Sequence, residues 1–457
     1  MRSTSKGAPM NYLSCASRWL YGAGDIGFSL TSTIIGAFFA IFLIDVVGIA
    51  PAVAAAAIFI GRTWDYINDP LIGYITDRTR SRWGRRRPFL LFGALPFAAA
   101  FTLLWWHPPL QGDLALAIYY AAVYVLYDIA ATFVYMPYFA LTPELTPDYD
   151  ERTSLTATRM FFSIAAGLVA FTVPVMMVGG FRPEHASRVL LMAATFGLAS
   201  ALPLWVVFLS ARERPELMSQ PPPKLRRSVT AAIHNRPFLF GLGIYLFTWV
   251  SVSIVEAVLI FFIKYVVQRE AQTDLIMATI FVTGIVALPL WQWTSRRLNK
   301  RLAYVIGIAF WAAVQLVLAS LTATTGLPLL LFLCVLAGIG VSAAHVLPWS
   351  IIPDAIEWGE LQTGERHEGM FYSLITLAQK IASSVAVPLA LLVLGRTGYI
   401  ANSAVQPASA VNGIRLVAGP IPAVLLCLGI GFALLYPLGR EGYAAIAAQL
   451  EARRPTL

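Results

Sequence analysis

The sequence contains few charged residues, few histidines and few cysteines. Only 12% of its 457 residues are charged, whereas 58% are hydrophobic. Soluble domains carry about 25% charged residues, so most of this surface must face something other than water. The three cysteines have neither metal-site nor disulfide spacing. The sequence also lacks a zinc HExxH pattern, a nucleophile elbow, a Walker loop and a nucleotide-binding glycine motif, so it indicates no enzyme class.

Apolar residues instead occur in runs long enough to cross a bilayer as helices, which takes about 20 residues each. These runs do not show the strict alternation of a barrel wall, so the sequence predicts an all-α membrane protein. We expect about twelve transmembrane helices. They are predicted near residues 20–46, 52–76, 88–106, 114–141, 153–180, 188–210, 238–267, 274–295, 302–324, 327–353, 370–395 and 413–437.

The formal net charge of +9 is explained by where the basic residues lie. Most lysines and arginines fall in the terminal segments and in alternate connections between the apolar runs. Because positively charged loops stay in the cytoplasm, we expect both termini to be cytoplasmic in a multi-pass protein of the plasma (inner) membrane. An even number of helices agrees with this topology. The charge therefore requires no nucleic-acid partner.

Residues 211–236 are basic and proline-rich, and we interpret them as a cytoplasmic linker. The linker separates two predicted six-helix bundles, residues 1–210 and 237–457. Their sequences echo each other in PYFALTPE (137–144) and PWSIIPD (348–354), although short proline motifs can also match by chance. Two related six-helix halves resemble the architecture of major facilitator transporters.

Ionisable residues inside the predicted helices need a reason, since a charge at mid-bilayer costs roughly 2.5–3.5 kcal/mol. Asp65 and Asp69 are four residues apart and share a helix face, with Asn68 between them. Two carboxylates in a dry interior repel unless a proton or cation lies between them. This pattern predicts a coupling-ion site for H⁺ or Na⁺. The alternative is a structural pair of Arg62 with Asp65, which leaves Asp69 unexplained.

A second group of polar residues suits a polyhydroxylated ligand. Asp25 and Asp128 offer acceptors, Arg159 offers a forked donor, and Tyr124 shares a helix face with Asp128. We assign these residues, together with Thr376, to substrate binding. The alternative is a structural pair of Asp128 with Arg159.

Lys380 lies one turn after Thr376 and is expected to be the counter-ion of the coupling-ion site, with snorkelling to the membrane surface as the alternative. Asp45 and Glu256 lie nearer the outer ends of their helices, and we interpret them as partly hydrated interfacial groups. His345 is interpreted as a packed, hydrogen-bonded histidine rather than a proton relay.

The segment NDPLIGYITDRTRSRWGRRRPF (68–89) resembles the signature of the glycoside–pentoside–hexuronide:cation symporters, the family of melibiose permease. The resemblance spans most of the chain and includes PYFALTPELTPDYDER, which follows Asp128. It implies alternating access around a sugar site near the membrane midplane. It further implies a sugar held by Asp25, Asp128 and Arg159, and Na⁺, H⁺ or Li⁺ held by Asp65 and Asp69 with Lys380 close by; the match at Thr376 and Lys380 rests on spacing alone.

Two positions depart from melibiose permease. Thr132, one turn after Asp128, replaces a tryptophan, which leaves the particular sugar open. Val125 replaces a hydroxyl residue of that family's cation site. Burial and a neighbouring carboxylate both favour a protonated carboxyl group, so we expect coupling to H⁺ at least as readily as to Na⁺.

The sequence therefore predicts a monomeric, cation-coupled symporter that imports a sugar or glycoside and has no enzyme activity. A carrier of lysophospholipids or other amphiphiles, which animal relatives of that family move, is the alternative. Such a carrier is expected to line its cavity with apolar residues and to need only one charged partner for the headgroup. A sensor or scaffold would not need the complete carboxylate pair.

The basic segment DRTRSRWGRRR (77–87) is predicted to form a cytoplasmic gate. Its partners would be acidic residues at the inner ends of the helices predicted at 114–141 and 327–353. The alternative is that it only sets the topology. The residues assigned to the gate are Asp77, Arg78, Arg82, Arg85, Glu144, Arg152 and Asp354.

A cysteine placed at Thr79, in a chain whose native cysteines are replaced by serine, tests this topology. It should react with a membrane-impermeant thiol reagent in inside-out vesicles and stay unmodified in intact cells, because the loop that carries it is cytoplasmic. Labelling from outside intact cells alone would overturn the assignment of both termini.

Overall fold

The computed structural model describes residues 14–146, 149–213, 230, 232–363, 368–403, 405–438, 446 and 449. Helices and their connections account for all of these residues, which confirms the predicted all-α class. The chain is all-α because its long apolar runs avoid water. Where no water is available, a helix satisfies its own backbone hydrogen bonds. Prolines in the first turn begin several of the helices, where a missing N–H costs nothing.

The helices before the central segment form the amino half of the molecule. They are α1 (Cys15–Gly22), α2 (Asp25–Ile41), the π-helix η1 (Phe42–Val46), α3 (Pro51–Thr63), α4 (Asp65–Arg78), α5 (Arg87–Leu104), α6 (Asp113–Leu145), α7 (Tyr149–Val178), the 3₁₀-helix η2 (Pro183–His185) and α8 (Ala186–Ser210). The predicted linker follows α8, and residues 214–229 and 231 within it lie outside the described residues.

The helices after that segment form the carboxy half. They are α10 (Arg236–Phe261), the π-helix η4 (Phe262–Val266), the 3₁₀-helix η5 (Glu270–Gln272), α11 (Thr273–Arg297), α12 (Lys300–Ala319), α13 (Leu327–Thr363), α14 (Glu368–Arg396), α15 (Ala408–Ala418) and α16 (Pro420–Leu434). The echoing proline segments lie inside α6 and α13, and α13 continues beyond its predicted end at residue 353.

Among the described residues, 11 helical segments are long and apolar enough to cross a membrane. The remaining predicted span corresponds to α3 and α4, which follow one another with an interruption at Trp64. Its apolar part, α3, has only 13 residues, and the rest carries Asp65 and Asp69. The charges of this segment therefore set it apart from the other spans, and with it the predicted count of twelve is reached.

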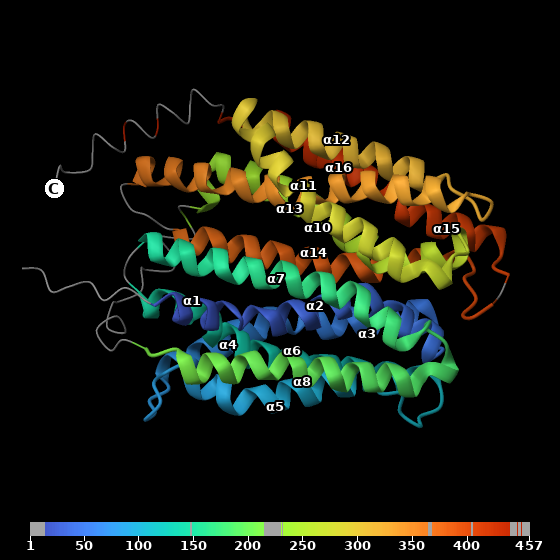
Figure 1. The fold of residues 1–457 in the computed structure, drawn as a ribbon, viewed down its shortest axis with the longest axis horizontal. Coiled ribbons are helices and arrows are strands. Elements are labelled where there is room, and N and C mark those ends of the chain that lie inside the picture. The colour runs from blue at the N-terminus through green and yellow to red at the C-terminus, as the bar shows by residue number, and fades with distance from the viewer. Residues whose placement is uncertain are drawn as a thin grey trace, which may run out of the picture.

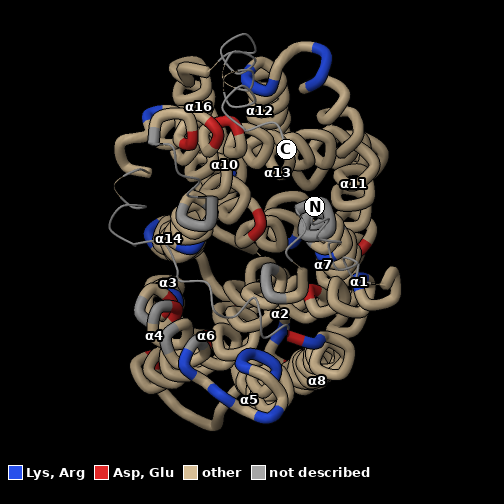
Figure 2. Tube along the Cα trace, turned by 90° about the vertical axis from the view of Figure 1, so that its left-hand side faces the viewer, with Lys and Arg blue, Asp and Glu red and all other residues tan. Residues whose placement is uncertain are grey.

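Figure 1 shows the helices of the amino half grouped on one side of the molecule and those of the carboxy half on the other, with most axes along its length. The two halves meet where α3 contacts α14, where α7 contacts α11, and where α2 contacts α10. We call the end of the bundle at η1 and η4 the distal end, and the end at which α1 begins the proximal end. The predicted topology makes the proximal end cytoplasmic. Figure 2, which looks onto that end, shows basic residues gathered before α5.

Buried aromatic side chains fill the core of the amino half, where Phe39 and Phe42 pack against Trp105 and Tyr120. Many large apolar side chains remain exposed on the outer faces of the helices. In water such a surface would drive aggregation, whereas in a bilayer it faces lipid. The fold places several charged side chains between the halves, where the candidate ion site lies.

Candidate functional site

Three charged side chains meet between α4 and α14. Asp65 and Asp69 lie one helical turn apart on α4. The Lys380 ammonium lies 2.7 Å from Asp65 Oδ2 and 2.5 Å from Asp69 Oδ2. Because α4 belongs to the amino half and α14 to the carboxy half, this ion triad links the two halves. The spacing that suggested a coupling-ion site therefore has its counter-ion on the opposite half.

Helix α6 covers the triad from within the amino half. The Asn68 side-chain amide donates to the Asp128 backbone carbonyl at 3.2 Å, which fixes α4 against α6. One turn further along α6, the Thr132 hydroxyl oxygen lies 3.4 Å from Asp65 Oδ1 and 3.4 Å from Asp69 Oδ1. The Asp128 carboxylate interacts electrostatically with the same triad, and its Oδ2 makes no hydrogen bond within the described part of the chain.

Arg62 makes a second link between the halves. Its Nε donates to the Tyr124 hydroxyl at 2.8 Å, and its Nη1 donates to the Ser383 carbonyl of α14 at 2.7 Å. The Tyr66 hydroxyl also hydrogen-bonds the Ser384 hydroxyl. These serines lie one turn along α14 from the lysine of the triad, so one face of α14 is attached to α3 and α4 at successive turns.

Glu256 of α10 faces the amino half at the same level. A Cβ atom added to Gly36 of α2 would lie 2.7 Å from Glu256 Oε1, so the absence of a side chain at Gly36 makes room for this carboxylate. Glu256 interacts electrostatically with Arg62. A guanidinium from one half and a carboxylate from the other therefore face each other near the centre of the molecule.

Asp25 and Arg159 form a separate pair within the amino half. Arg159 Nη2 lies 3.5 Å from Asp25 Oδ1, and Asp25 is only 2% exposed. The guanidinium carbon lies 4.5 Å from the centre of the Phe139 ring and 5.3 Å from that of Tyr138. Arg159 Nε and the Tyr135 hydroxyl are buried without a hydrogen bond to any described residue. The pair thus combines an acceptor, a forked donor and aromatic faces.

The structure places several predicted site residues in other groups than the sequence suggested. Asp128 lies with the α4 carboxylates, and the described contacts include neither an Asp128–Arg159 pair nor an Arg62–Asp65 pair. Tyr124 accepts from Arg62, and Thr376 lies at an exposed position of α14. Both structural alternatives considered for these charges are therefore wrong.

Thr132 was not among the residues that the sequence analysis assigned to a site. It was noted only as the replacement for a tryptophan that leaves the particular sugar open. Its hydroxyl lies against the carboxylates of the coupling-ion site, because the α6 face that carries Asp128 also faces α4. The pattern of the family could not show this, since no hydroxyl is expected there.

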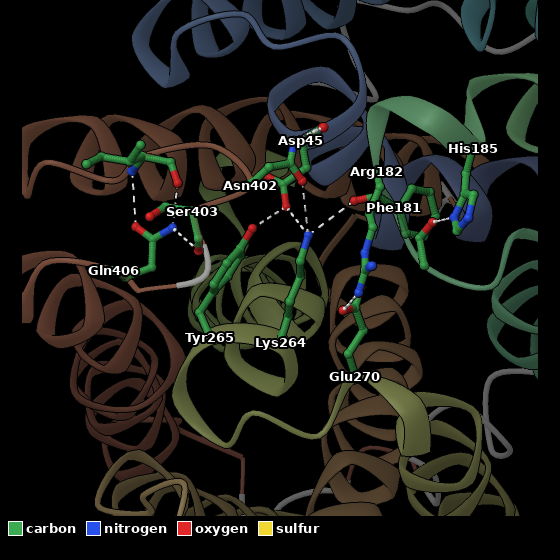
Figure 3. Close-up of polar contacts among 12 residues, drawn as sticks. Asp45, Phe181, Arg182, His185, Lys264, Tyr265, Glu270, Asn402, Ser403 and Gln406 are labelled. Carbon is green, nitrogen blue, oxygen red and sulfur yellow. Dashed lines mark hydrogen bonds and ion pairs between the residues drawn. The ribbon is translucent and has the colours of Figure 1, made fainter.

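A cluster at the distal end joins the halves again, around Asp45 (Figure 3). Lys264 Nζ and the Tyr265 hydroxyl lie 2.6 and 2.5 Å from Asp45 Oδ2, and the Tyr399 hydroxyl lies 2.6 Å from Oδ1. The Asn402 amide donates to the Asp45 backbone carbonyl. We call these five residues the distal closure. Three side-chain donors from the carboxy half satisfy one carboxylate of the amino half.

The distal closure rests on an internal repeat that the sequence analysis missed. The segments FLIDVV (42–47) and FIKYVV (262–267) occupy equivalent places, and each contains a π-helix closed by an i→i+5 backbone hydrogen bond of 3.0 or 3.1 Å. The residue after each, Gly48 or Gln268, has a positive φ. Single π-turns occur frequently at functional sites. Here they turn an acid of one half and a lysine of the other toward each other.

The interpretation of Asp45 as a partly hydrated interfacial group is wrong, because Asp45 is 0% exposed. Its position near a helix end indicated water, but the matching helix end of the other half covers it. Glu256 likewise lies against α2. His345 is hydrogen-bonded as expected, with Nδ1 2.9 Å from the Val341 carbonyl, and its ring lies beside Trp249, but the residue is exposed rather than packed in a core.

A second ion pair and a cavity adjoin the distal closure. Arg182 Nη2 lies 2.8 Å from Glu270 Oε2, again across the two halves, as Figure 3 shows. The Lys264 ammonium also donates to the Phe181 carbonyl at 3.1 Å. A cavity of about 210 Å³ lies beside these groups, lined by residues of both halves that include Ile260 and Asp274.

Only part of the predicted cytoplasmic gate lies among the described residues. The side chains of Asp77, Glu144 and Arg152 lie outside the described residues. Asp354 forms an ion pair of 2.5 Å with Lys300, inside the carboxy half. The backbone amide of Arg85 donates to Glu213 at 2.6 Å, inside the amino half, and the Arg82 guanidinium lies over the Trp83 ring. Bridging of the halves by this segment, in which Arg78 was also included, stays a prediction.

The distal closure predicts the effect of Asp45→Asn. The readout is a cysteine placed at Ile260 in a chain without native cysteines. A thiol reagent applied at the distal side should modify this cysteine about 10–100-fold faster in Asp45→Asn than in the chain that keeps Asp45. The reason is that loss of a charge-assisted hydrogen bond, worth about 1.5–3 kcal/mol, favours opening. Asp274→Asn is the matched control, because Asp274 lines the same cavity and, among the described residues, accepts only from the Leu275 amide of its own helix. Equal rates in the two variants would show that Asp45 does not hold the halves together.

Comparisons with known proteins concern the family and the fold. Residues 20–440 match the family model described as MFS/sugar transport protein. The chain is 33% identical to the uncharacterized symporter sll1374 of Synechocystis, over 95% of this chain and 96% of that protein. It is 28% identical to the sodium-dependent lysophosphatidylcholine symporter 1-A of Danio rerio, over 93% of this chain and 86% of that protein.

The fold is also similar to that of a D-xylose-proton symporter, with a TM-score of 0.66 and 16% identity over 92% of this chain and 96% of that one. At this identity the likeness concerns the fold alone. Taken with the family match and the helices long enough to cross a membrane, it shows that this chain belongs to the MFS/sugar transport family and is an integral, multi-pass membrane protein with the major facilitator fold.

Proposed function

We propose that this protein is a cation-coupled symporter that imports a sugar or glycoside by alternating access. The observation that carries the proposal is the Asp65–Asp69 pair, which is held by a lysine from the opposite half. Relatives over nearly the whole chain are named as symporters. The resemblance to the glycoside–pentoside–hexuronide:cation symporters, carried by residues 68–89, supports the same class.

The ion triad supplies a physical route from ion binding to movement. A cation or proton that reaches the carboxylates competes electrostatically with the Lys380 ammonium, because both are attracted to the same two carboxylates. When it binds, the ionic attachment of α14 to α4 weakens, while the hydrogen bond from Arg62 to Ser383 remains. Occupancy of the ion site thereby changes how strongly the two halves hold each other. An ion can shift a conformational equilibrium only through such differential contacts.

The Asp25–Arg159 pair is our candidate for the substrate site. A carboxylate accepts from paired hydroxyl groups, and a guanidinium donates to hydroxyl or ring oxygens. The Phe139 ring beside Arg159 offers an apolar face to a sugar ring, whereas Tyr138 is fully buried. The Tyr135 hydroxyl and Arg159 Nε have no hydrogen bond within the described chain, and a polyhydroxylated ligand would satisfy both.

A lysophospholipid is the second candidate substrate. The relative in Danio rerio is named for lysophosphatidylcholine, whose zwitterionic headgroup can pair with a cationic and an anionic group, one more than the single charged partner expected from the sequence. Arg62 and Glu256 face each other across the halves and offer both charges. This candidate predicts that transport depends on Glu256, whereas the sugar proposal predicts that it depends on Asp25.

Uptake into proteoliposomes tests the proposal. Labelled sugars, glycosides and lysophosphatidylcholine are offered with an imposed Na⁺ gradient, and separately with an imposed proton gradient in Na⁺-free medium. We expect uptake of a sugar or glycoside driven by at least one gradient. Asp25→Asn should weaken apparent affinity about 10–100-fold, because it removes the charge from an acceptor worth about 1.5–3 kcal/mol.

Two variants serve as controls. Asp113→Asn changes an exposed aspartate at the start of α6 and should leave uptake unchanged, and Glu256→Gln should spare sugar uptake. Uptake of lysophosphatidylcholine alone, lost in Glu256→Gln and kept in Asp25→Asn, would favour the second candidate. A folded protein that transports none of these compounds under either gradient would contradict the proposal.

A further inference from the structure

Thr132 occupies a place in the ion site that complements Lys380. The lysine contacts the Oδ2 atoms of Asp65 and Asp69, whereas the Thr132 hydroxyl lies 3.4 Å from the Oδ1 atom of each. Each carboxylate thus has one oxygen toward α14 and the other toward α6. Thr132 is 7% exposed, so its hydroxyl is removed from bulk water.

One hydroxyl cannot satisfy two carboxylates. It carries a single proton, so it can donate to Asp65 or to Asp69 but not fully to both. Both separations of 3.4 Å are also longer than an ordinary O–H···O hydrogen bond, which is about 2.5–3.0 Å. Three oxygens therefore face one another with one proton among them. A small cation held by all three would remove the repulsion that this arrangement contains.

We propose that Thr132 supplies a hydroxyl oxygen to a binding site for a small monovalent cation, of which Na⁺ is the probe of choice, formed with Asp65 Oδ1 and Asp69 Oδ1. This inference rests on the proposed function. It assigns a ligand on α6 that makes the site selective for a metal cation over a proton. A proton requires only one carboxylate, whereas Na⁺ requires several oxygens held at fixed positions.

The charge of the site fits a singly charged ion. Two carboxylates beside one ammonium carry a formal net charge of −1. No three acidic, histidine or cysteine side chains among the described residues are placed to hold a metal ion together, so Asp128 is an electrostatic neighbour rather than a third carboxylate ligand. A divalent cation would find too little negative charge here.

The backbone holds Thr132 in register. The hydrogen bond from Asn68 to the Asp128 carbonyl pins α4 to α6 one turn before Thr132, and Asn68 is itself 2% exposed. The Thr132 position lies seven residues after Val125, nearly two turns along α6, so both positions point to nearly the same side of the helix. The hydroxyl that the sequence lacks at Val125 is thus present further along the same face.

The test compares Thr132→Val, which keeps the shape and removes the oxygen, with Thr132→Ser, which keeps the oxygen. Purified proteins are titrated with NaCl, with choline chloride balancing ionic strength, and thermal unfolding reports binding. We expect the Na⁺ concentration for half-maximal stabilisation to rise about 10–100-fold in the valine variant, as for loss of metal-site partners. The serine variant should stay near the unmodified protein.

Uptake separates the two ions. In Thr132→Val, uptake driven by a Na⁺ gradient should fall with the loss of Na⁺ affinity, while uptake driven by a proton gradient without Na⁺ should persist. Thr172→Val is the matched control, because within the described part of the chain the Thr172 hydroxyl donates only to the Leu168 carbonyl of its own helix. Unfolding of each variant without Na⁺ establishes that it is folded.

Three results would overturn the inference, and none of them is a failure of symport itself. They are a Thr132→Val protein with unchanged Na⁺ affinity, an unmodified protein driven by protons alone with no response to Na⁺, and a folded valine variant that loses both kinds of uptake equally. The last would mean that Thr132 only positions the carboxylates. Absence of any ion-driven uptake in the unmodified protein would instead reject the proposed function.

Discussion

A lysine held between two carboxylates inside a membrane protein is the interaction on which the rest of this structure depends. Each of these charges is costly to bury alone, so Asp65, Asp69 and Lys380 stay together only while nothing else compensates the carboxylates. Since the lysine comes from the opposite half, its ion pairs are also contacts between α4 and α14. Ion binding at the carboxylates and packing of the two helical bundles are therefore coupled in one equilibrium. The interrupted span α3–α4 carries the carboxylates of this site.

The distal closure repeats this principle at one end of the molecule. Asp45 is buried under donors from the carboxy half, and two of them, Lys264 and Tyr265, lie on the π-helical segment that matches its own. Opening that end must expose a carboxylate and an ammonium that satisfy each other when it is shut. Near the ion triad, Arg62 also donates across the halves to the Ser383 carbonyl. Alternating access in this account is an exchange among these contacts, each of which water, an ion or a substrate can replace.

Local geometry made part of this site predictable. A spacing of four residues on a helix fixes the common face of Asp65 and Asp69, and the length of apolar runs fixes where the chain crosses the membrane. Positions such as Thr132 could not be placed, because the α6 face that meets α4 depends on packing between helices. Asp45 was misjudged for a similar reason: hydropathy gives its depth, but its partner Lys264 comes from the other half. The FLIDVV and FIKYVV repeat was the available signal, since equivalent helix ends meet across a pseudo-symmetric interface.

Competition between Lys380 and the coupling ion is the central claim, and cation binding to Lys380→Gln tests it most directly. Isothermal titration of the purified protein with Na⁺ at fixed pH, beside the unmodified protein, measures the affinity of the ion site. The account predicts tighter binding in Lys380→Gln, because glutamine removes the positive charge that occupies the carboxylates while keeping much of the side-chain volume. Equal or weaker binding in a folded Lys380→Gln protein would contradict it, and would mean that the lysine supports the ion site rather than competing for it.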